Sequence, residues 1–186
     1  MSTPLIEMKD AGKHYLDRTF TLSVARSSVT ILSGENGIGK TTLIHLMLGY
    51  VTSDKGPVRR RAKRIAYVPE HVFLPPYVTA LTYMRTLARI KRCPFDPSLL
   101  HRFRVPLLKS IRKLSKGNRR KLSIAGAFLC DPELVILDEP LDGLDDEARD
   151  TLVTFIGDAV LRGVACVIAT HEPSVFNLAE AVHIRL

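Results

Sequence analysis

The clearest chemical pattern in the chain is a glycine-rich run that ends in a lysine and a threonine. It reads Gly34-Glu35-Asn36-Gly37-Ile38-Gly39-Lys40-Thr41 and fits the spacing G-x-x-x-x-G-K-[ST] at every fixed position. Glycines at this spacing let successive backbone N–H groups converge on an anion, and a helix that begins near Gly39 adds its positive dipole end. Lys40 would then reach the β- and γ-phosphates of a nucleotide, Thr41 would bind Mg²⁺, and Thr42 could contact the α-phosphate.

A second pattern places two neighbouring carboxylates at the end of an apolar run. The run Leu134-Val135-Ile136-Leu137 leads directly into Asp138 and Glu139. Ligands of open α/β sheets bind at the carboxyl ends of the strands, so both side chains are expected beside the glycine-rich loop. Asp138 would hold Mg²⁺, and Glu139 is placed to orient and deprotonate an attacking water.

The elements that position these residues follow an α/β pattern. An apolar, β-branched run at 29–32 precedes the glycine-rich loop and a helix-like run at 43–48 follows it, which is the strand–loop–helix setting of a phosphate-binding loop. Further strands are predicted at 5–8, 20–24, 65–68, 134–137, 164–169 and 182–184. Further helices are predicted from Thr79 to about residue 90 and at 98–103, 117–130 and 145–161.

Length and composition favour one globular domain. The chain has 186 residues, of which 46% are hydrophobic and 25% charged, enough to bury a sizeable core. Its first ten residues carry charges and lack the apolar stretch of a secretory signal, and its longest apolar runs are far shorter than the roughly 20 residues that span a bilayer. The three cysteines lie far apart without a C-x-x-C pair, which suggests neither a zinc site nor a disulfide framework; Cys130 and Cys166 lie in apolar runs typical of core residues.

The net charge of +8 is spread unevenly. Residues 59–121 hold 18 of the 27 lysines and arginines and only two acids, whereas residues 131–186 hold 12 acids and three arginines. This division is compatible with a face for nucleic acid, for an anionic membrane surface or for an acidic partner, and equally with an ordinary solvated face.

Three further motifs narrow the class. Leu114-Ser115-Lys116-Gly117-Asn118 stands just before the helix that leads to Asp138, Leu141-Asp142-Gly143-Leu144-Asp145 follows Glu139, and His171 follows the next strand. Each is weak alone. In this order, together with the glycine-rich loop, they resemble the ATP-binding-cassette (ABC) ATPase family, in which they are the signature motif, the D-loop and the switch histidine.

The resemblance covers the chain from Tyr15 to His171 and implies a fold. It implies an α/β fold of the P-loop NTPase (RecA-like) type, a mostly parallel sheet flanked by helices, with an N-terminal antiparallel β subdomain and a small helical subdomain. The whole chain, 1–186, would be one ABC ATPase domain with subdomains at about 1–71, 72–116 and 117–186.

The resemblance also implies a head-to-tail dimer that encloses two ATP molecules with Mg²⁺. Ser115 and Gly117 of one subunit would contact the γ-phosphate held by the other subunit, through a hydroxyl and an unobstructed backbone N–H. His171 would hydrogen-bond the γ-phosphate and help to hold the attacking water. Tyr15 stands at the family's adenine-stacking position, although a tyrosine there is equally compatible with simple packing.

Two departures from the family pattern stand out. Glu70 in Tyr67-Val68-Pro69-Glu70 occupies the position of the Q-loop glutamine, and with Leu74-Pro75-Pro76 it resembles the subgroup that works with ABC-2-type exporters. A carboxylate at Glu70 can still approach Mg²⁺ or water. Lys116 and Asn118 replace the common second glycine and final glutamine of the signature, while Ser115 and Gly117 are retained.

The favoured interpretation is the ATPase subunit of an ABC transporter. It would sit at the cytoplasmic face of the membrane and power a separate permease, with export favoured by the subgroup resemblance. The permease would dock on the helical subdomain at about 72–116, called the helical insert below, and on the loop around Glu70. The basic residues between Arg85 and Lys121 could face lipid headgroups or acidic coupling segments. The alternative is a soluble ABC ATPase that acts on nucleic acid or ribosomes. A cassette that binds without hydrolysing is disfavoured because Lys40, Asp138, Glu139 and His171 are all present.

Overall fold

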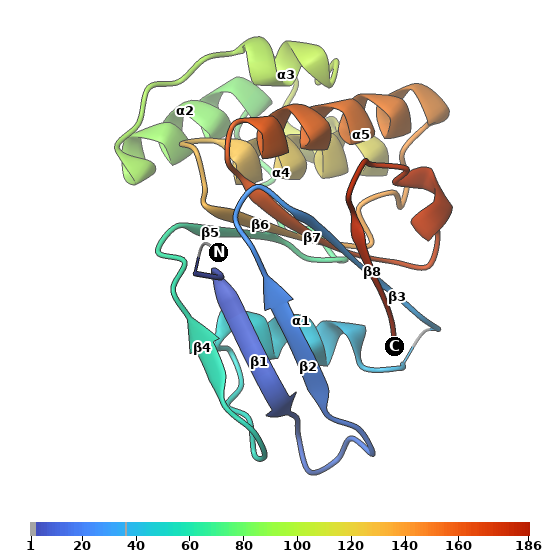
Figure 1. Cartoon of the computed structure of the whole chain (residues 1–186). Coiled ribbons are helices and arrows are strands. Elements are labelled where there is room, and N and C mark those ends of the chain that lie inside the picture. The colour runs from blue at the N-terminus through green and yellow to red at the C-terminus, as the bar shows by residue number, and fades with distance from the viewer. Residues whose placement is uncertain (1–2, 36) are drawn as a thin grey trace.

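The computed structural model describes residues 3–35 and 37–186, and its strands form two sheets (Figure 1). A five-stranded sheet has the order β5-β6-β7-β3-β8 with every neighbouring pair parallel, and a three-stranded antiparallel sheet has the order β2-β1-β4. The strands are β1 (Ile6–Ala11), β2 (Phe20–Val24), β3 (Val29–Ser33), β4 (Val58–Arg60), β5 (Ile65–Val68), β6 (Leu134–Asp138), β7 (Ala165–Thr170) and β8 (Val182–Arg185). The predicted parallel sheet and N-terminal antiparallel sheet are confirmed.

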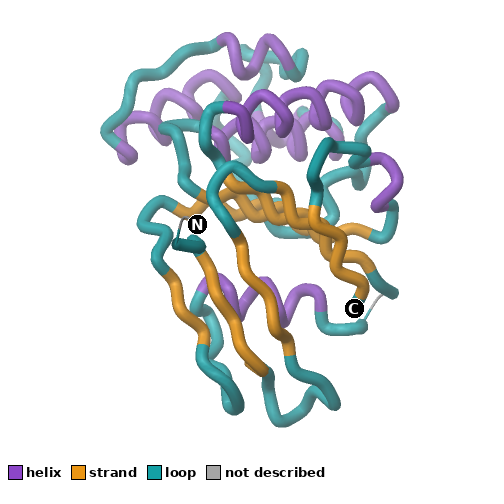
Figure 2. The backbone as a smooth tube through the Cα atoms, in the orientation of Figure 1, coloured by secondary structure: helices purple, strands orange, loops and turns teal. Residues whose placement is uncertain are grey.

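Helices cover both faces of the parallel sheet. The longer ones are α1 (Lys40–Leu48), α2 (Ala80–Lys91), α4 (Lys116–Phe128) and α5 (Asp146–Leu161), with the short α3 (Ser98–Arg102) after α2. Figure 2 shows α2 to α5 gathered above the sheet, and α1 between it and the antiparallel sheet. Side-chain caps begin three of these helices: Thr79, the predicted cap, accepts from Thr82 N–H, and Asp145 accepts from Ala148 N–H. Ser115 is the third cap and accepts from Asn118 N–H.

The alternation of side chains along the strands divides the core between these layers. Val135 and Leu137 of β6 pack with the buried residues of α2, α4 and α5. Leu134 and Ile136 point the other way and pack with α1, β1 and β2. Since successive strand residues point to opposite faces, a continuous apolar run is what a strand covered on both sides requires.

The strand register brings the polar ends of the chain's motifs to one edge of the sheet. Ser33 at the end of β3 pairs with Thr170 at the end of β7, and Asp138 at the end of β6 pairs with Ala169. The loop after β3, the carboxylates after β6 and His171 after β7 therefore emerge side by side.

One strand was not expected from the sequence. The segment Val58–Arg60 pairs antiparallel with β1, although two of its three residues are arginines with exposed side chains. The Arg60 side chain turns to the C-terminal end of α1, where its Nε donates to the Met47 carbonyl at 2.9 Å. A three-residue edge strand carries no periodic signal, so only its partner defines it.

The basic middle of the chain and its acidic end meet in the fold. Three ion pairs connect α3, α4 and the turn after α3 to α5 and its cap: Arg102–Asp158 at 2.8 Å, Arg104–Glu147 at 2.6 Å and Lys121–Asp145 at 3.3 Å. A fourth joins Lys116 to Asp142 at 2.7 Å. Some of the basic residues in the middle of the chain are therefore already paired with acids from its end, and these are not free to bind an external partner.

The prediction about the cysteines was wrong in part. Cys93 and Cys130 form a disulfide with their Cα atoms 5.6 Å apart, because α2 and α4 end beside one another. Cys130 is partly exposed, whereas Cys166 is a buried core residue as expected. Among residues 3–35 and 37–186, no helix has the length and apolar character needed to cross a membrane.

Candidate nucleotide-binding and catalytic site

A cavity of about 380 Å³ lies where the glycine-rich loop meets the carboxyl edge of the parallel sheet. The predicted site residues that line it come from three separate parts of the chain: Gly37, Gly39, Lys40, Thr41, Thr42, Glu70, Asp138 and Glu139. Gly34, Glu35 and Ile38 belong to the same loop without lining the cavity, and Asn36 lies outside the described residues. The fold thus assembles one polar pocket from segments up to about a hundred residues apart.

The loop has the backbone that its glycines predict. Gly37 and Gly39 have φ of 81° and 108°, values that residues with a Cβ rarely adopt. Lys40 is buried, and its ammonium donates to the carbonyls of Gly34 at 2.7 Å and Glu35 at 3.3 Å. These contacts hold the ammonium over the loop in the position from which it can meet a phosphate.

Asp138 lies under the beginning of α1. Its Oδ2 accepts from the Thr41 hydroxyl at 3.3 Å and from the Tyr67 hydroxyl at 3.4 Å. Burial, with the neighbouring charges of Glu139 and Glu70, raises the pKa of Asp138 above its ordinary value, and the hydrogen bonds only partly offset this. Burial and the charge of Asp138 likewise raise the pKa of Tyr67. A nearby cation would relieve the cost of keeping this carboxylate ionised.

Glu139 is held in an unusual local geometry. Its φ of 45° lies in the left-handed region, and its N–H donates to the Ala169 carbonyl at 2.9 Å. Oε2 lies 2.8 Å from His171 Nδ1, while Oε1 is buried and has no hydrogen-bond partner among the described residues. Lys40 Nζ is 3.5 Å from that Oε1. A buried acceptor without a partner, in a strained residue that faces a cavity, is typical of a site that receives a ligand or water.

Three residues that the family resemblance assigns to the nucleotide, Tyr15, Ser115 and Gly117, lie outside this cavity. Tyr15 is 68% exposed in the turn between β1 and β2 and does not line the cavity. Ser115 is exposed at the beginning of α4, and Gly117 packs against the D-loop so closely that an added Cβ would collide with the Gly143 carbonyl. The proximity of Gly117 to the D-loop gives this glycine a packing role that the sequence did not indicate.

Arg120 is a residue of this region that sequence reasoning missed. It was grouped with the basic residues that could face lipid or a partner, but its side chain is 3% exposed. It donates to the carbonyls of Pro69, at 2.7 Å, and Glu70, and lies 3.9 Å from Asp142. Arg120 therefore fixes the loop that carries Glu70 to the helix that follows Ser115. An arginine in a helix with apolar neighbours at helical spacing was the available signal.

A second cavity, of about 490 Å³, lies on the far side of Glu70. Glu70 lines both cavities, and the second is also lined by His71, Phe73, Lys116, Arg119, Arg120 and Asp142. Phe73 and the nearby Tyr77 are 90% and 82% exposed. The Glu70 loop thus connects the polar pocket to a surface with large exposed aromatic side chains, of which Tyr77 lies under the Arg112 guanidinium, 5.8 Å from the ring centroid.

The geometry is that of a P-loop domain with two carboxylates beside the glycine-rich loop, and comparison with known proteins identifies its family. The family model described as "ABC transporter" matches residues 18–142. The chain therefore belongs to the ABC transporter family, as an ATP-binding domain.

The relatives include ATP-binding proteins of both export and import systems. Nod factor export ATP-binding protein I of Bradyrhizobium diazoefficiens is 31% identical over 92% of this chain and 63% of its own length. Zinc import ATP-binding protein ZnuC of Halorhodospira halophila is 32% identical over 91% of this chain and 68% of its own length. A Nod factor export protein of Ralstonia nicotianae is matched over 60% of its length, so the chain spans about three fifths of several relatives. ATP binding is the property that these relatives support.

Solved structures agree on the fold. A structure titled as the ATP binding subunit of an ABC transporter superposes with a TM-score of 0.82 at 29% identity, covering 91% of this chain and 80% of its own. A putative ABC transporter ATP-binding protein from Pyrococcus furiosus gives a TM-score of 0.82 at 22% identity, covering 97% and 96% of the two chains, which is a likeness of fold alone.

Proposed function

We propose that this protein is the ATP-binding and ATP-hydrolysing subunit of an ABC transporter, and that it powers export through a separate membrane permease. One observation carries the catalytic part of the proposal. Glu139 Oε1 is buried without a hydrogen-bond partner among the described residues, beside Lys40, while Oε2 is held by His171. A water between Oε1 and a bound phosphate would satisfy this acceptor.

Nucleotide binding would use the whole glycine-rich loop. The phosphate oxygens of ATP would replace the Gly34 and Glu35 carbonyls as partners of the Lys40 ammonium. Backbone N–H groups of the loop and the beginning of α1 would complete the phosphate site, with Thr42 beside the α-phosphate. Tyr15 is proposed to move over the adenine, since its side chain is exposed on the turn next to the loop.

The donor set fits Mg²⁺. Thr41 Oγ1 and Asp138 Oδ2 are hard oxygen donors 3.3 Å apart, and the raised pKa of the buried Asp138 indicates a carboxylate that gains from a cation. Within the described part of the chain no three His, Cys, Asp or Glu side chains cluster to hold a metal alone, whereas Mg²⁺ characteristically uses one or two protein ligands together with substrate phosphates. Thr41 and Asp138 would hold the ion and Glu70 could approach it. Bound there, the ion would neutralise phosphate charge.

Hydrolysis needs a base and a means of positioning it. Glu139 would orient the attacking water and accept its proton, and His171 would keep the carboxylate in place and hydrogen-bond the γ-phosphate. Lys40 would stabilise the charge that develops on the phosphate oxygens. The His171 side chain is 59% exposed, so it can reach a ligand in the cavity.

The dimer proposal rests on Ser115 and Gly117. Ser115 is exposed and does not line the cavity of its own chain, so a nucleotide contact would have to be made with another subunit's ATP. The resemblance to the ABC family supports such a contact in a head-to-tail dimer, either of two copies or with a related subunit. ATP would then hold the subunits together and hydrolysis would release them.

The permease is proposed to dock where the Glu70 loop meets the helical insert. Phe73, which lines the 490 Å³ cavity, and the exposed Tyr77 four residues further on offer apolar contact area there. The docked subunit would lie at the cytoplasmic face of the membrane. Export, in place of import, is inferred from Glu70 and its resemblance to the ABC-2 subgroup.

The test uses a Glu139→Gln variant, recovered with ATP and Mg²⁺ from detergent-solubilised cells. Without its base the variant should keep ATP bound and remain dimeric, and a multi-span membrane protein should accompany it in stoichiometric amount. Glu133→Gln makes the same chemical change at the other end of β6. It should trap neither the ATP-bound dimer nor the membrane protein. A variant that hydrolyses ATP at the normal rate would contradict the role of Glu139.

The second candidate function, a soluble ABC ATPase that acts on nucleic acid or ribosomes, is favoured by the +8 charge. The internal ion pairs of α3 and α4 with α5 weaken that argument. Recovery of ribosomes or nucleic acid with Glu139→Gln, in place of a membrane protein, would support it. Such binding would fall steeply with salt because counterions are released.

A further inference from the structure

The Cys93–Cys130 disulfide lies at the edge of the parallel sheet opposite the nucleotide loop. Cys93 follows the last turn of α2 and Cys130 follows α4, 37 residues further along the chain. Figure 1 shows the chain passing from α4 into β6 at one end of the sheet, while the loop between β3 and α1 lies at the other. The bond therefore links the helical insert to the segment that begins β6.

Both cysteines line a cavity. Cys93 and Cys130 are partly exposed and line a cavity of about 570 Å³, a size that admits a small organic molecule. Cys166 provides an internal contrast, because it is fully buried and burial raises the pKa of its thiol to about 12. Thiol chemistry in this protein is therefore expected at the first pair and not at Cys166.

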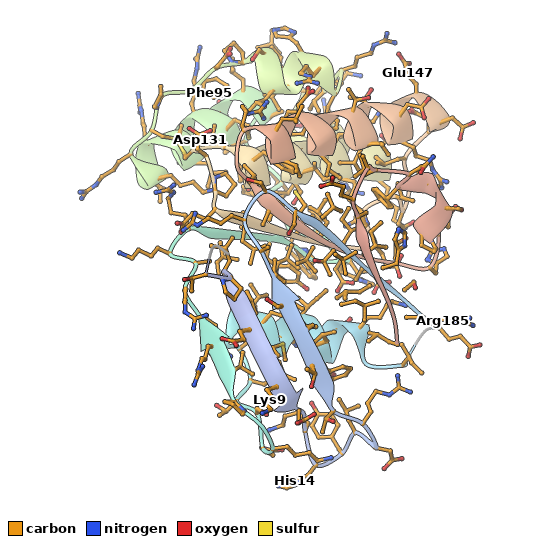
Figure 3. All side chains as sticks on the ribbon, in the orientation of Figure 1. Lys9, His14, Phe95, Asp131, Glu147 and Arg185 are labelled. Carbon is orange, nitrogen blue, oxygen red and sulfur yellow. A yellow bond between two sulfur atoms is a disulfide. The ribbon has the colours of Figure 1, made fainter. Side chains whose placement is uncertain are left out.

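The cavity is strongly basic. Lys63, Arg64, Lys91 and Arg92 line it, and Asp131 is the single acid among its described lining residues. In Figure 3 the Asp131 label lies at this end of the molecule, with Phe95 near it and Arg185 at the opposite side. Lys63 and Arg92 are exposed and have no ion-pair partner within the described parts of the chain. A cavity with this balance attracts anions.

Backbone conformation and hydrogen bonds also help to position the two cysteines. Arg92 adopts φ of 56° and closes α2, and the N–H of Cys93 donates to the Ala88 carbonyl at 3.0 Å. Cys130 and Asp131 have φ of 70° and 46°, so the turn after α4 is also left-handed. Such residues persist only where the surrounding structure holds them, so both thiols should stay in place after reduction.

We propose that Cys93 and Cys130 form a thiol–disulfide exchange site whose partner is an anionic low-molecular-weight disulfide or thiol bound in this basic cavity. The exchange proceeds in two steps. The thiolate of one cysteine attacks a sulfur of the small disulfide, which forms a mixed disulfide and releases one small thiolate. The second cysteine then attacks the mixed disulfide, which forms the Cys93–Cys130 bond and releases the second small thiolate. The two protons of the cysteine thiols pass to the released thiolates, and the two electrons leave the protein with them.

The experiment compares two small disulfides of opposite charge. The reduced, full-length protein is mixed with glutathione disulfide, which is anionic, or cystamine, which is cationic, and oxidation is followed by alkylation of the remaining thiols and mass spectrometry. The two reagents differ in intrinsic reactivity. The ratio of their oxidation rates in the wild type is therefore compared with the same ratio in a Lys63→Gln/Arg92→Gln variant. A Lys109→Gln/Lys113→Gln variant, with the same charge change on exposed residues outside the cavity, is the control.

At low salt the rate ratio, glutathione disulfide over cystamine, should be about tenfold higher in the wild type and control than in the cavity variant. It should fall as salt is added. Cys130→Ser should accumulate a glutathione mixed disulfide on Cys93, because no second thiol resolves it. A rate ratio unchanged by Lys63→Gln/Arg92→Gln would overturn the anion site. Thiols of Cys93 and Cys130 that react no faster than Cys166 would overturn the exchange site itself.

Discussion

Strand β6 has carboxylates at both of its ends, and the two ends differ in how well these carboxylates are hydrogen-bonded. Glu133 precedes the strand at the amino edge of the sheet. Its Oε2 accepts from the backbone N–H groups of Lys63 at 2.6 Å and Arg64 at 3.1 Å, and Arg26 donates to Oε1 at 3.2 Å. These hydrogen bonds lower the pKa of Glu133 from its ordinary value of 4.5 to about 2.

At the carboxyl edge the same strand delivers Asp138 and Glu139. Burial raises the pKa of Asp138, and Glu139 Oε1 is buried with no hydrogen-bond partner among the described residues. Glu139 also has a left-handed backbone. The carboxylate at the amino edge is fully paired and serves the fold, whereas those at the carboxyl edge are left short of partners that a ligand would supply.

The largest effect expected from this comparison is on turnover. Glu139→Gln should lower the ATPase rate about 10²–10⁴-fold, the usual contribution of a general base, while Glu133→Gln leaves it near the wild-type value. Steady-state phosphate release by the two variants measures the difference. Equal losses in both variants would show that the two ends of β6 do not differ in this way.

Arg120 tests whether the carboxyl edge also contains a purely structural polar group. Arg120→Met should reduce the free energy of unfolding by about 4 kcal/mol, because the carbonyls of Pro69 and Glu70 lose a buried charged donor. Urea unfolding gives the value. Arg119→Met, at the exposed neighbouring position, should change it by less than about 0.5 kcal/mol. A similar result for both would mean that the Arg120 contacts contribute nothing net.

The disulfide extends the comparison to covalent stabilisation at the amino edge. Reduction, or the Cys93→Ser change, should lower the free energy of unfolding by about 4 kcal/mol, the loop-closure value for 37 residues. Thermal unfolding with and without reductant measures it, and Cys93→Ser should abolish the response to reductant. A wild-type melting temperature that is independent of reductant would contradict this.

The smallest effect concerns acid. Because the pKa of Glu133 is lowered in the folded state, its stabilisation is complete above pH 4.5 and is lost as the pH falls toward 2. Glu133→Gln should therefore cost about 1 kcal/mol at neutral pH and reduce the loss of stability across that range. Unfolding free energies measured from pH 7 to pH 2 test this. If the stability of the variant and of the wild type changed with pH in the same way, Glu133 would not contribute to unfolding in acid.

The sequence alone predicted the parallel sheet, most helix boundaries and the residues of the glycine-rich loop. These features are local. Strand and helix periodicity, the Thr79 cap and the fixed spacing from Gly34 to Thr41 depend only on residues that are close together in the sequence. Asp138, Glu139 and His171 could also be placed, because the carboxyl ends of parallel strands share one edge.

Only the tertiary structure decided which side chains meet across long separations. Arg120 is buried beneath the Glu70 loop, Cys93 bonds to Cys130, and the basic α3 and α4 pair with the acidic α5. In each case the residue type is the same as on an exposed surface, and its role follows from the segment packed against it. Burial and pairing depend on contacts between distant parts of the chain, which residue spacing along the sequence does not record.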